Sequence, residues 1–455
     1  MRDWNLKSSP EIEKKRKKAY VPVILLILSV LCACVPVNVR QKRQEPEETV
    51  QTVTAETPGA IQVIDINGDV HETSIDVIDA SEAEDNTSNA LPERSLAQVA
   101  QNLSLSDEAN FAYSQLNESG KNCYREIYAI LTDMLEKVDL SSKDPDEVDL
   151  AFRAVMVDHP EIFYVKGYSI GKYMSGNKLK KIAFSGTYTM TADEVASGRE
   201  VVDAYVQRVI DGCPEGSSDY EKIKYVYDLL IRENEYDPDS ENNQNIMSVV
   251  KNGRTVCQGY TKVMQLVLGK MDIFCTLVNG KACGRGGVPD ADELANAKNV
   301  EWGGHVWNIV KCEGMYYNVD VTWGDAAITL LNNDGSLTRD IDVNYEFFLV
   351  DDDYIAETHD PEPVVPMPRC NSMEDNYYRH EGLYFTGIDP DQFYRAFDSA
   401  LASGESVLFI KASSPDVYEE IKYHLFDEQN VFEYMGRSNV RYVEFSERNL
   451  IMISL

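Results

Sequence analysis

The sequence predicts an α+β protein built around a helix that carries a cysteine and an antiparallel sheet that carries a histidine and an aspartate. After Cys257, apolar residues recur at intervals of three and four, which is typical of one buried helix face. Residues 305–312 and 315–322 are rich in Val, Ile, Trp and Tyr and are separated by Glu313-Gly314, a pattern that predicts a two-stranded hairpin. A mainly helical region is expected before this core, and a small α/β domain after it.

Cys257 occupies a position that favours a nucleophile. Gly253 and the polar residues after it indicate a turn, so Cys257 falls in the first turn of the predicted helix. Unpaired backbone N–H groups and the positive end of the helix dipole favour the thiolate there. The same N–H groups are placed to hold a developing oxyanion.

The predicted hairpin places His305 and Asp320 on one face of the sheet. If the two residues after Cys312 form the loop, Cys312 pairs with Met315 and counting back sets His305 opposite Thr322. Alternate residues of a strand share a face, and so do directly opposed residues. Asp320 is therefore a diagonal neighbour of His305, which brings a carboxylate within reach of an imidazole.

Three motifs resemble those of the transglutaminase-like superfamily, a branch of the papain-like cysteine enzymes, in its bacterial extracytoplasmic form. They are Val256-Cys257-Gln258-Gly259-Tyr260, Gly304-His305-Val306-Trp307-Asn308 and Tyr317-Asn318-Val319-Asp320, in that order. The resemblance covers roughly residues 202–353. It implies that Cys257 is the nucleophile, His305 the general base and Asp320 the acid that orients the base.

Trp307, Gln258 and Tyr260 are the residues of these motifs that we expect to bind substrate. By alternation Trp307 shares the face of His305, where it either walls the substrate cleft or packs within the sheet. Gln258 follows the cysteine, whereas the oxyanion glutamine of papain-like proteases precedes it, so a second oxyanion group is not assigned. The polar loop over 236–245 is expected to border the cleft.

The sequence gives no pattern for a metal or a cofactor, and we expect neither. The loop over 280–301, immediately before His305, is glycine-rich and acidic and is a natural place for substrate selection. Its acidic residues match no Ca²⁺-loop spacing. The cysteines show neither a CxxC pattern nor a His-paired zinc spacing, and their disulfide pairing stays open, with Cys275 and Cys283 as one option.

The N-terminal segment carries the features of an export signal. Five basic residues at 14–18 precede an uncharged run over 19–37. Leu31-Cys32-Ala33-Cys34 resembles a bacterial lipobox, which makes Cys34 the expected lipidated residue. The alternative is an uncleaved signal anchor. Both alternatives tether the rest of the chain to the cell membrane on its extracytoplasmic side.

The net charge of the chain argues against nucleic-acid binding. The 455 residues include 43 basic and 76 acidic side chains, a formal charge of −33, which repels nucleic acid. We expect the following organisation along the chain: a signal peptide with lipobox (1–34), a disordered acidic stalk (35–95) with one good hairpin turn at Asn67-Gly68, an N-terminal helical or α+β region (96–200), the core (201–360) and a C-terminal α/β domain (371–455).

The two flanking regions have simpler patterns than the core. A helix expected over 146–157 ends at His159, which precedes a proline and is typical of a helix cap rather than of a second catalytic histidine. Short strands are expected between 163 and 188. The β-α-β-α-β-β order expected over 371–455 predicts a small α/β domain. Its sequence shows no nucleophile set or metal cluster, so we expect an adaptor or cell-surface binding role.

These observations predict a membrane-tethered enzyme that acts on amide bonds of polypeptides or cell-wall peptides through a cysteine thioester. Water as acceptor gives a peptidase or deamidase, and an amine acceptor gives a transamidase. A surface enzyme that faces bulk water favours hydrolysis. The alternative is a catalytically inactive peptide- or cell-surface-binding module that retains the three residues.

Overall fold

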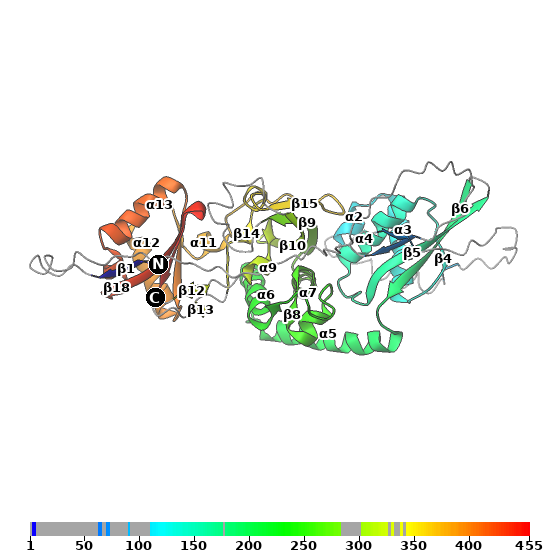
Figure 1. Ribbon diagram of the computed structural model, residues 1–455, viewed down its shortest axis with the longest axis horizontal. Helices are drawn as coiled ribbons and strands as arrows, with labels where there is room; N and C mark the ends of the chain where they lie inside the picture. Colours follow the sequence, from blue (N-terminus) through cyan, green and yellow to red (C-terminus); the bar gives the residue numbers. More distant parts are fainter. Residues whose placement is uncertain are drawn as a thin grey trace, which may run out of the picture.

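The computed structural model describes residues 2–5, 62–65, 70–72, 90–91, 110–175, 178–283, 302–325, 329–331, 337–339 and 343–455. Three bodies follow one another along the long axis, with the central one carrying helix α7 (Figure 1). The apolar run 19–37, Cys34 and most of the loop 280–301 lie outside the described residues. Within the described part of the chain, no helix has the length and apolarity needed to cross a membrane.

The N-terminal domain combines helices with an antiparallel sheet. Its helices are α2 (Phe111–Gln115), α3 (Glu118–Thr132) and α4 (Pro145–Asp158). The sheet has the order β3-β2-β5-β6-β4, made of Val70–Glu72, Gln62–Asp65, Val165–Ser175, Lys178–Tyr188 and Val138–Asp139. Two segments of the predicted stalk, on either side of the hairpin turn expected at Asn67-Gly68, form strands that pair with each other and with β5.

The central sheet has the order β14-β11-β10-β9-β15, with all neighbours antiparallel. Its strands are Phe348–Val350, Met315–Val319, Trp302–Cys312, Cys275–Cys283 and His359–Pro361. The predicted register is confirmed, because Cys312 pairs with Met315 across a turn with positive φ at both Glu313 and Gly314. The second strand is shorter than predicted: it ends at Val319, before the short helix α9 (Val321–Gly324).

Helix α7 (Cys257–Lys270) packs on this sheet beside α6 (Asp219–Glu233), as the apolar spacing predicted. Gly259 is required in its first turn, because a Cβ there would lie 1.9 Å from the Thr255 hydroxyl oxygen. Three short elements precede α7: strand β7 (Glu235–Tyr236), the π-helix Ser248–Asn252 and strand β8 (Arg254–Thr255). The backbone that enters α7 is therefore held at several points.

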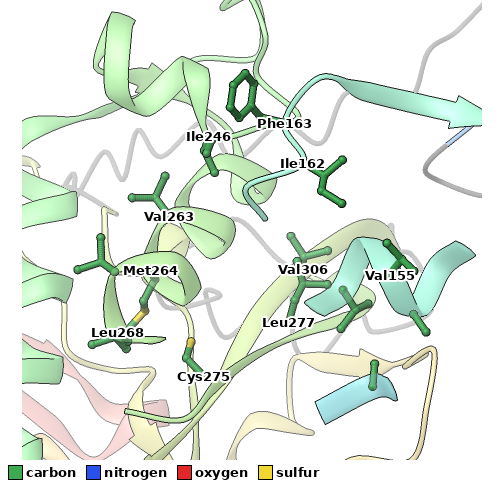
Figure 2. Packing of buried hydrophobic residues seen from close by; sticks show 14 of the residues in the cluster. Val155, Ile162, Phe163, Ile246, Val263, Met264, Leu268, Cys275, Leu277 and Val306 are labelled. Atoms are coloured by element: carbon green, nitrogen blue, oxygen red, sulfur yellow. The ribbon is translucent and has the colours of Figure 1, made fainter. Parts of the chain in front are cut away.

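The N-terminal and central domains share one continuous hydrophobic core. Figure 2 shows Val155, Ile162 and Phe163 of the N-terminal domain facing Ile246 and Val306 of the central domain. Helix α5 (Ala192–Gly212) starts at the N-terminal domain and runs along the central one (Figure 1). The two domains therefore form a joint unit.

The C-terminal domain has its own hydrophobic core and the expected strand and helix order. Its sheet has the order β1-β18-β19-β17-β16, made of Arg2–Asn5, Asn439–Phe445, Leu450–Ser454, Val407–Ala412 and Tyr384–Phe385. The helices are α12 (Pro390–Ala402), α13 (Pro415–Lys422) and the short α14 (Val431–Met435). Short elements link it to the central domain: α10 (Asp352–Ile355) and α11 (Tyr377–His380). A small hairpin, β12 (Thr329–Leu331) with β13 (Leu337–Arg339), precedes them.

The seven cysteines in the described part of the chain form no disulfide with one another. The disulfide considered between Cys275 and Cys283 is not formed, since these residues stand at opposite ends of β9. Eight residues of strand separate them by roughly 26 Å, far beyond the reach of a disulfide.

Glu346, Lys411 and Arg448 form a buried charged cluster that joins the central and C-terminal domains. The Glu346 carboxylate is 3% exposed, and it accepts a hydrogen bond from Lys411 Nζ at 3.3 Å. Arg448 Nε lies 3.9 Å from the same oxygen. Burial opposes ionisation of Glu346, but the two cations outweigh it and hold its pKa below the ordinary value.

Glu346→Gln is expected to lower the free energy of unfolding by about 3–5 kcal/mol, because it leaves the buried Lys411 ammonium without its counter-charge and removes one of the two carboxylates beside Arg448. Chemical denaturation of the full chain measures this. Glu357→Gln is the matched control: Glu357 also pairs with Arg448 but is 58% exposed, so its loss is expected to stay under about 1 kcal/mol. Equal losses in the two variants would contradict the assigned role of the cluster.

Candidate active site

Cys257 is the first residue of α7 and is largely buried, with 8% of its surface exposed. The preceding residue, Val256, is extended and has no side-chain oxygen with which to cap the helix. The backbone N–H groups at this end are therefore not occupied by a cap, and the helix dipole favours negative charge beside them. This is the environment expected for Cys257 from the sequence.

Two hydrogen bonds attach α7 to the strand that carries His305. The Thr261 hydroxyl donates to the Val306 carbonyl at 3.3 Å, and the Asn308 side-chain amide donates to the Thr261 carbonyl at 3.1 Å. Thr261 lies one helical turn after Cys257 on the same face, and Val306 is the neighbour of His305. The start of α7 is thereby held against the His305 end of β10.

His305 and Asp320 form a buried hydrogen-bonded pair. Nε2 of His305 lies 2.7 Å from Oδ2 of Asp320, and each side chain is 1% exposed. Because Nε2 is directed at the carboxylate, Nδ1 is the ring nitrogen left for proton exchange with a reacting group. The diagonal contact expected from the hairpin register is therefore present in the structure.

Asp320 directly follows β11, and its side chain caps the next helix. Its Oδ1 accepts a hydrogen bond from the Trp323 backbone N–H at 3.1 Å, at the start of α9. Burial opposes ionisation of Asp320, but the charge of His305 and the hydrogen bonds from His305 and His359 outweigh it and hold its pKa well below the usual range. Asp320 is thus a fixed anion.

His359 is a second histidine on the Asp320 carboxylate, and the sequence analysis missed it. Its Nε2 lies 3.1 Å from Oδ2 of Asp320, and its Nδ1 lies 2.9 Å from the Thr358 hydroxyl oxygen. Burial lowers the pKa of His359, so the ring is neutral, with Nε2–H donating to Asp320. His359 comes from β15, which reaches the site by pairing with β9, and no motif marks it.

Trp307 and Tyr260 lie deeper than a substrate-binding role requires. Trp307 is 1% exposed, its indole N–H donates to Asn318, and its ring stacks near His305 with a centroid separation of 6.3 Å. Tyr260 is fully buried, and its hydroxyl donates to Asp325 at 2.6 Å. Both residues support the site from within the core, whereas half-buried Gln258 retains surface for a substrate.

Lys262 is a further charged residue beside Cys257 that the sequence analysis missed. It is 7% exposed, and its ammonium donates to the Gln244 carbonyl at 3.0 Å. Burial lowers the pKa of Lys262 to about 8, and the negative charge of Cys257 partly offsets this. An ammonium group close to a thiolate stabilises the thiolate.

His305, Asp320 and His359 are also the residues that could hold a metal ion in the described part of the chain. Their ligand atoms lie within 4.8 Å of one another. A metal ion there would take the same Nε2 and Oδ2 atoms that make the hydrogen bonds, and it would displace the orienting contact of His305. The hydrogen bonding therefore fits an acid–base pair more directly than a metal centre.

Comparisons with known proteins agree with this local arrangement. Residues 203–321 match the family model described as the transglutaminase-like superfamily. The kyphoscoliosis peptidase of Mus musculus is 22% identical over 206 residues, which cover 43% of this chain and 30% of that protein. The human kyphoscoliosis peptidase is 22% identical over 190 residues, which cover 40% and 27%. The chain thus matches under a third of the length of each relative.

Two solved structures show weaker likeness. A crystal structure of a TGase is 12% identical, with a TM-score of 0.22, and the match covers 35% of this chain and 44% of that one. A candidate protease from Parabacteroides distasonis is 10% identical, with a TM-score of 0.17 and coverage of 39% and 41%. These identities and TM-scores are too low to support a conclusion about this chain. The family model, in contrast, spans the Cys257 helix and the hairpin up to Asp320. The central domain of this chain belongs to the transglutaminase-like superfamily.

Proposed function

We propose that this protein is a membrane-tethered, extracytoplasmic cysteine enzyme that acts on amide bonds of polypeptides or cell-wall peptides through a thioester. The observation that carries the proposal is the buried His305–Asp320 pair on a strand hydrogen-bonded to the Cys257 helix. The tether rests on the basic region and apolar run at the N-terminus, with Cys34 as the lipidated residue.

In the first step, the Cys257 thiol gives its proton to Nδ1 of His305, and the resulting thiolate Sγ attacks the carbonyl carbon of the amide. A C–S bond forms while the carbonyl electron pair moves to oxygen, where the N–H groups at the start of α7 stabilise the negative charge. The C–N bond then breaks, and the protonated His305 gives its proton to the departing amine. The products of this half-reaction are a free amine and an acyl thioester on Cys257.

In the second step, His305 takes a proton from an incoming water or amine, which attacks the thioester carbonyl. The C–S bond breaks and Cys257 leaves as the thiolate. Water yields a carboxylic acid, and an amine yields a new amide. Asp320 keeps Nε2 of His305 protonated, so that Nδ1 carries the transferred proton in both steps.

The test is the pH dependence of Cys257 alkylation by iodoacetamide, followed by mass spectrometry. Cys257 is expected to react much faster than the other cysteines at a pH of about 6, below the ordinary thiol pKa of about 8.5. His305→Ala is expected to remove this advantage, because the imidazolium that stabilises the thiolate is gone.

Cys275 provides an internal control, because it is buried in β9 and burial raises its thiol pKa. If Cys257 reacts as an ordinary thiol in both proteins, the enzyme proposal fails and the binding-module alternative takes its place. If Cys257 is reactive, peptide and amine-donor screening then separates hydrolysis from transamidation.

His359 is expected to act as a positioning residue for Asp320. His359→Leu is expected to slow Cys257 alkylation at pH about 6 by roughly tenfold or more, because a hydrogen bond to a charged group contributes about 1.5–3 kcal/mol. His359→Gln retains an N–H donor and is expected to restore most of the rate.

Thermal unfolding of both variants separates orientation from simple destabilisation. A purely structural role predicts that the loss of reactivity follows the loss of stability. A positioning role predicts that His359→Gln recovers reactivity even where its stability stays below that of the parent.

A further inference from the structure

A cleft lies where the N-terminal domain meets the central domain. Its volume is about 290 Å³, and its walls come from the end of α4 and the start of β5, from loop 242–245, and from Lys262 of α7. Residues 242–245 of the polar loop therefore line this interdomain cleft. The volume suits one side chain or chain terminus of a bound peptide.

The charge of this cleft is opposite to that of the chain. Three basic side chains, His159, Lys166 and Lys262, line it, and among the described residues that form its walls none is a carboxylate. The whole chain carries a formal charge of −33. A lining whose ionisable side chains are all basic is therefore a local feature that the composition does not explain.

His159 supplies a buried donor to the cleft. The ring is 7% exposed, stacks on Tyr128 at a centroid separation of 4.1 Å, and bonds through Nδ1 to Glu161 at 2.8 Å. Its Nε2 has no hydrogen-bond partner among the described residues. Burial opposes protonation, but Glu161 and Asp158 outweigh it and raise the pKa of His159, which favours the cationic ring with its Nε2–H directed at the cleft.

Lys262 supplies the second buried cation and connects the cleft to Cys257. The ammonium has three N–H donors, and its hydrogen bond to Gln244 uses one of them. Lys262 follows Cys257 by five residues on α7, about 7.5 Å along the helix axis, and the charge of Cys257 raises the pKa of Lys262. A ligand that reaches Lys262 in the cleft therefore lies near the first turn of the helix that carries the nucleophile.

The two cations are held rigidly with respect to each other. Gln265, three residues after Lys262 on α7, donates a hydrogen bond to the Val157 carbonyl at 2.8 Å, two residues before His159. Val157 and the neighbours of Gln265 on α7 belong to the shared hydrophobic core. A site built from two such fixed donors does not have to reorganise on binding.

We propose that this interdomain cleft is a subsite that binds a carboxylate of the peptide substrate, from an acidic side chain or a chain terminus, beside the amide that Cys257 attacks. His159 and Lys262 make charge-assisted hydrogen bonds to the carboxylate, while Ile162 and Phe163 contact its aliphatic part. The inference deepens the proposed function and rests on it, because the bound peptide is a substrate only if Cys257 acts as a nucleophile. It assigns the N-terminal domain a direct part in specificity.

The experiment measures peptide binding to full-length Cys257→Ala protein, so that no turnover is needed. The probes are three labelled hexapeptides with the same neutral dye: Gly-Ala-Glu-Ala-Gly-Ala amide, its Gln counterpart, and the Gln counterpart with a free terminal carboxylate. At least one of the two carboxylate peptides is expected to bind about tenfold more tightly than the neutral peptide. The comparison of the two identifies which carboxylate the cleft takes.

Substitutions in the same background locate the preference. Lys262→Met keeps the aliphatic stem and His159→Phe keeps the stacked ring, and each is expected to abolish most of the tenfold difference. Lys166→Met is the matched control, since Lys166 lines the same cleft but is exposed, and it is expected to change the difference less than twofold.

Three outcomes would overturn the inference. They are equal binding of charged and neutral peptides, no binding of any carboxylate peptide, and a preference that survives both buried substitutions. The alkylation test distinguishes this from failure of the enzyme proposal. A reactive Cys257 without a charge preference removes the subsite alone. An unreactive Cys257 with the preference intact leaves a carboxylate-binding cleft in a non-catalytic module.

Discussion

The central domain depends on the buried carboxylate of Asp320. This fully buried anion accepts hydrogen bonds from His305, His359 and the Trp323 backbone N–H, which belong to β10, β15 and the start of α9. An unpaired charge at that depth is very unfavourable, so these three elements are held where they can satisfy it. The same interaction thus fixes the edge of the sheet, the end of β11 and the orientation of the candidate base.

The parts of the site that were predictable from sequence are those that local patterns encode. The Cys257 helix follows from apolar periodicity, and the His305–Asp320 contact follows from a two-residue turn that sets the hairpin register. His359 could not be found in this way, because β15 pairs with β9 out of chain order. The alternation of side chains along the strand placed Trp307 on the correct face of the sheet, but it does not predict how deeply Trp307 is buried. That burial depends on β15 and α9, whose His359 and Trp323 pack in the same region.

The shared core between the N-terminal and central domains also could not be predicted from the sequence. A boundary near residue 200 separates two stretches with different patterns, yet the apolar side chains on both sides belong to one core. Composition cannot show this, because each stretch is amphipathic enough to suggest a domain of its own. His159 is a helix cap, as its position beside a proline predicted. In the folded protein, His159 also lines the cleft between the two domains.

A strongly acidic protein with a basic cleft has two opposing effects on an acidic peptide, and their ranges differ. Exposed charges act through solvent, where ions screen them over roughly 8 Å at physiological salt. His159 and Lys262 are buried and act over hydrogen-bond distances, where screening is weak. The net charge therefore slows the approach of an acidic peptide, while the cleft retains the peptide once it has arrived. Such an arrangement discriminates by fit at two fixed donors rather than by long-range attraction, which would collect any anion at the surface.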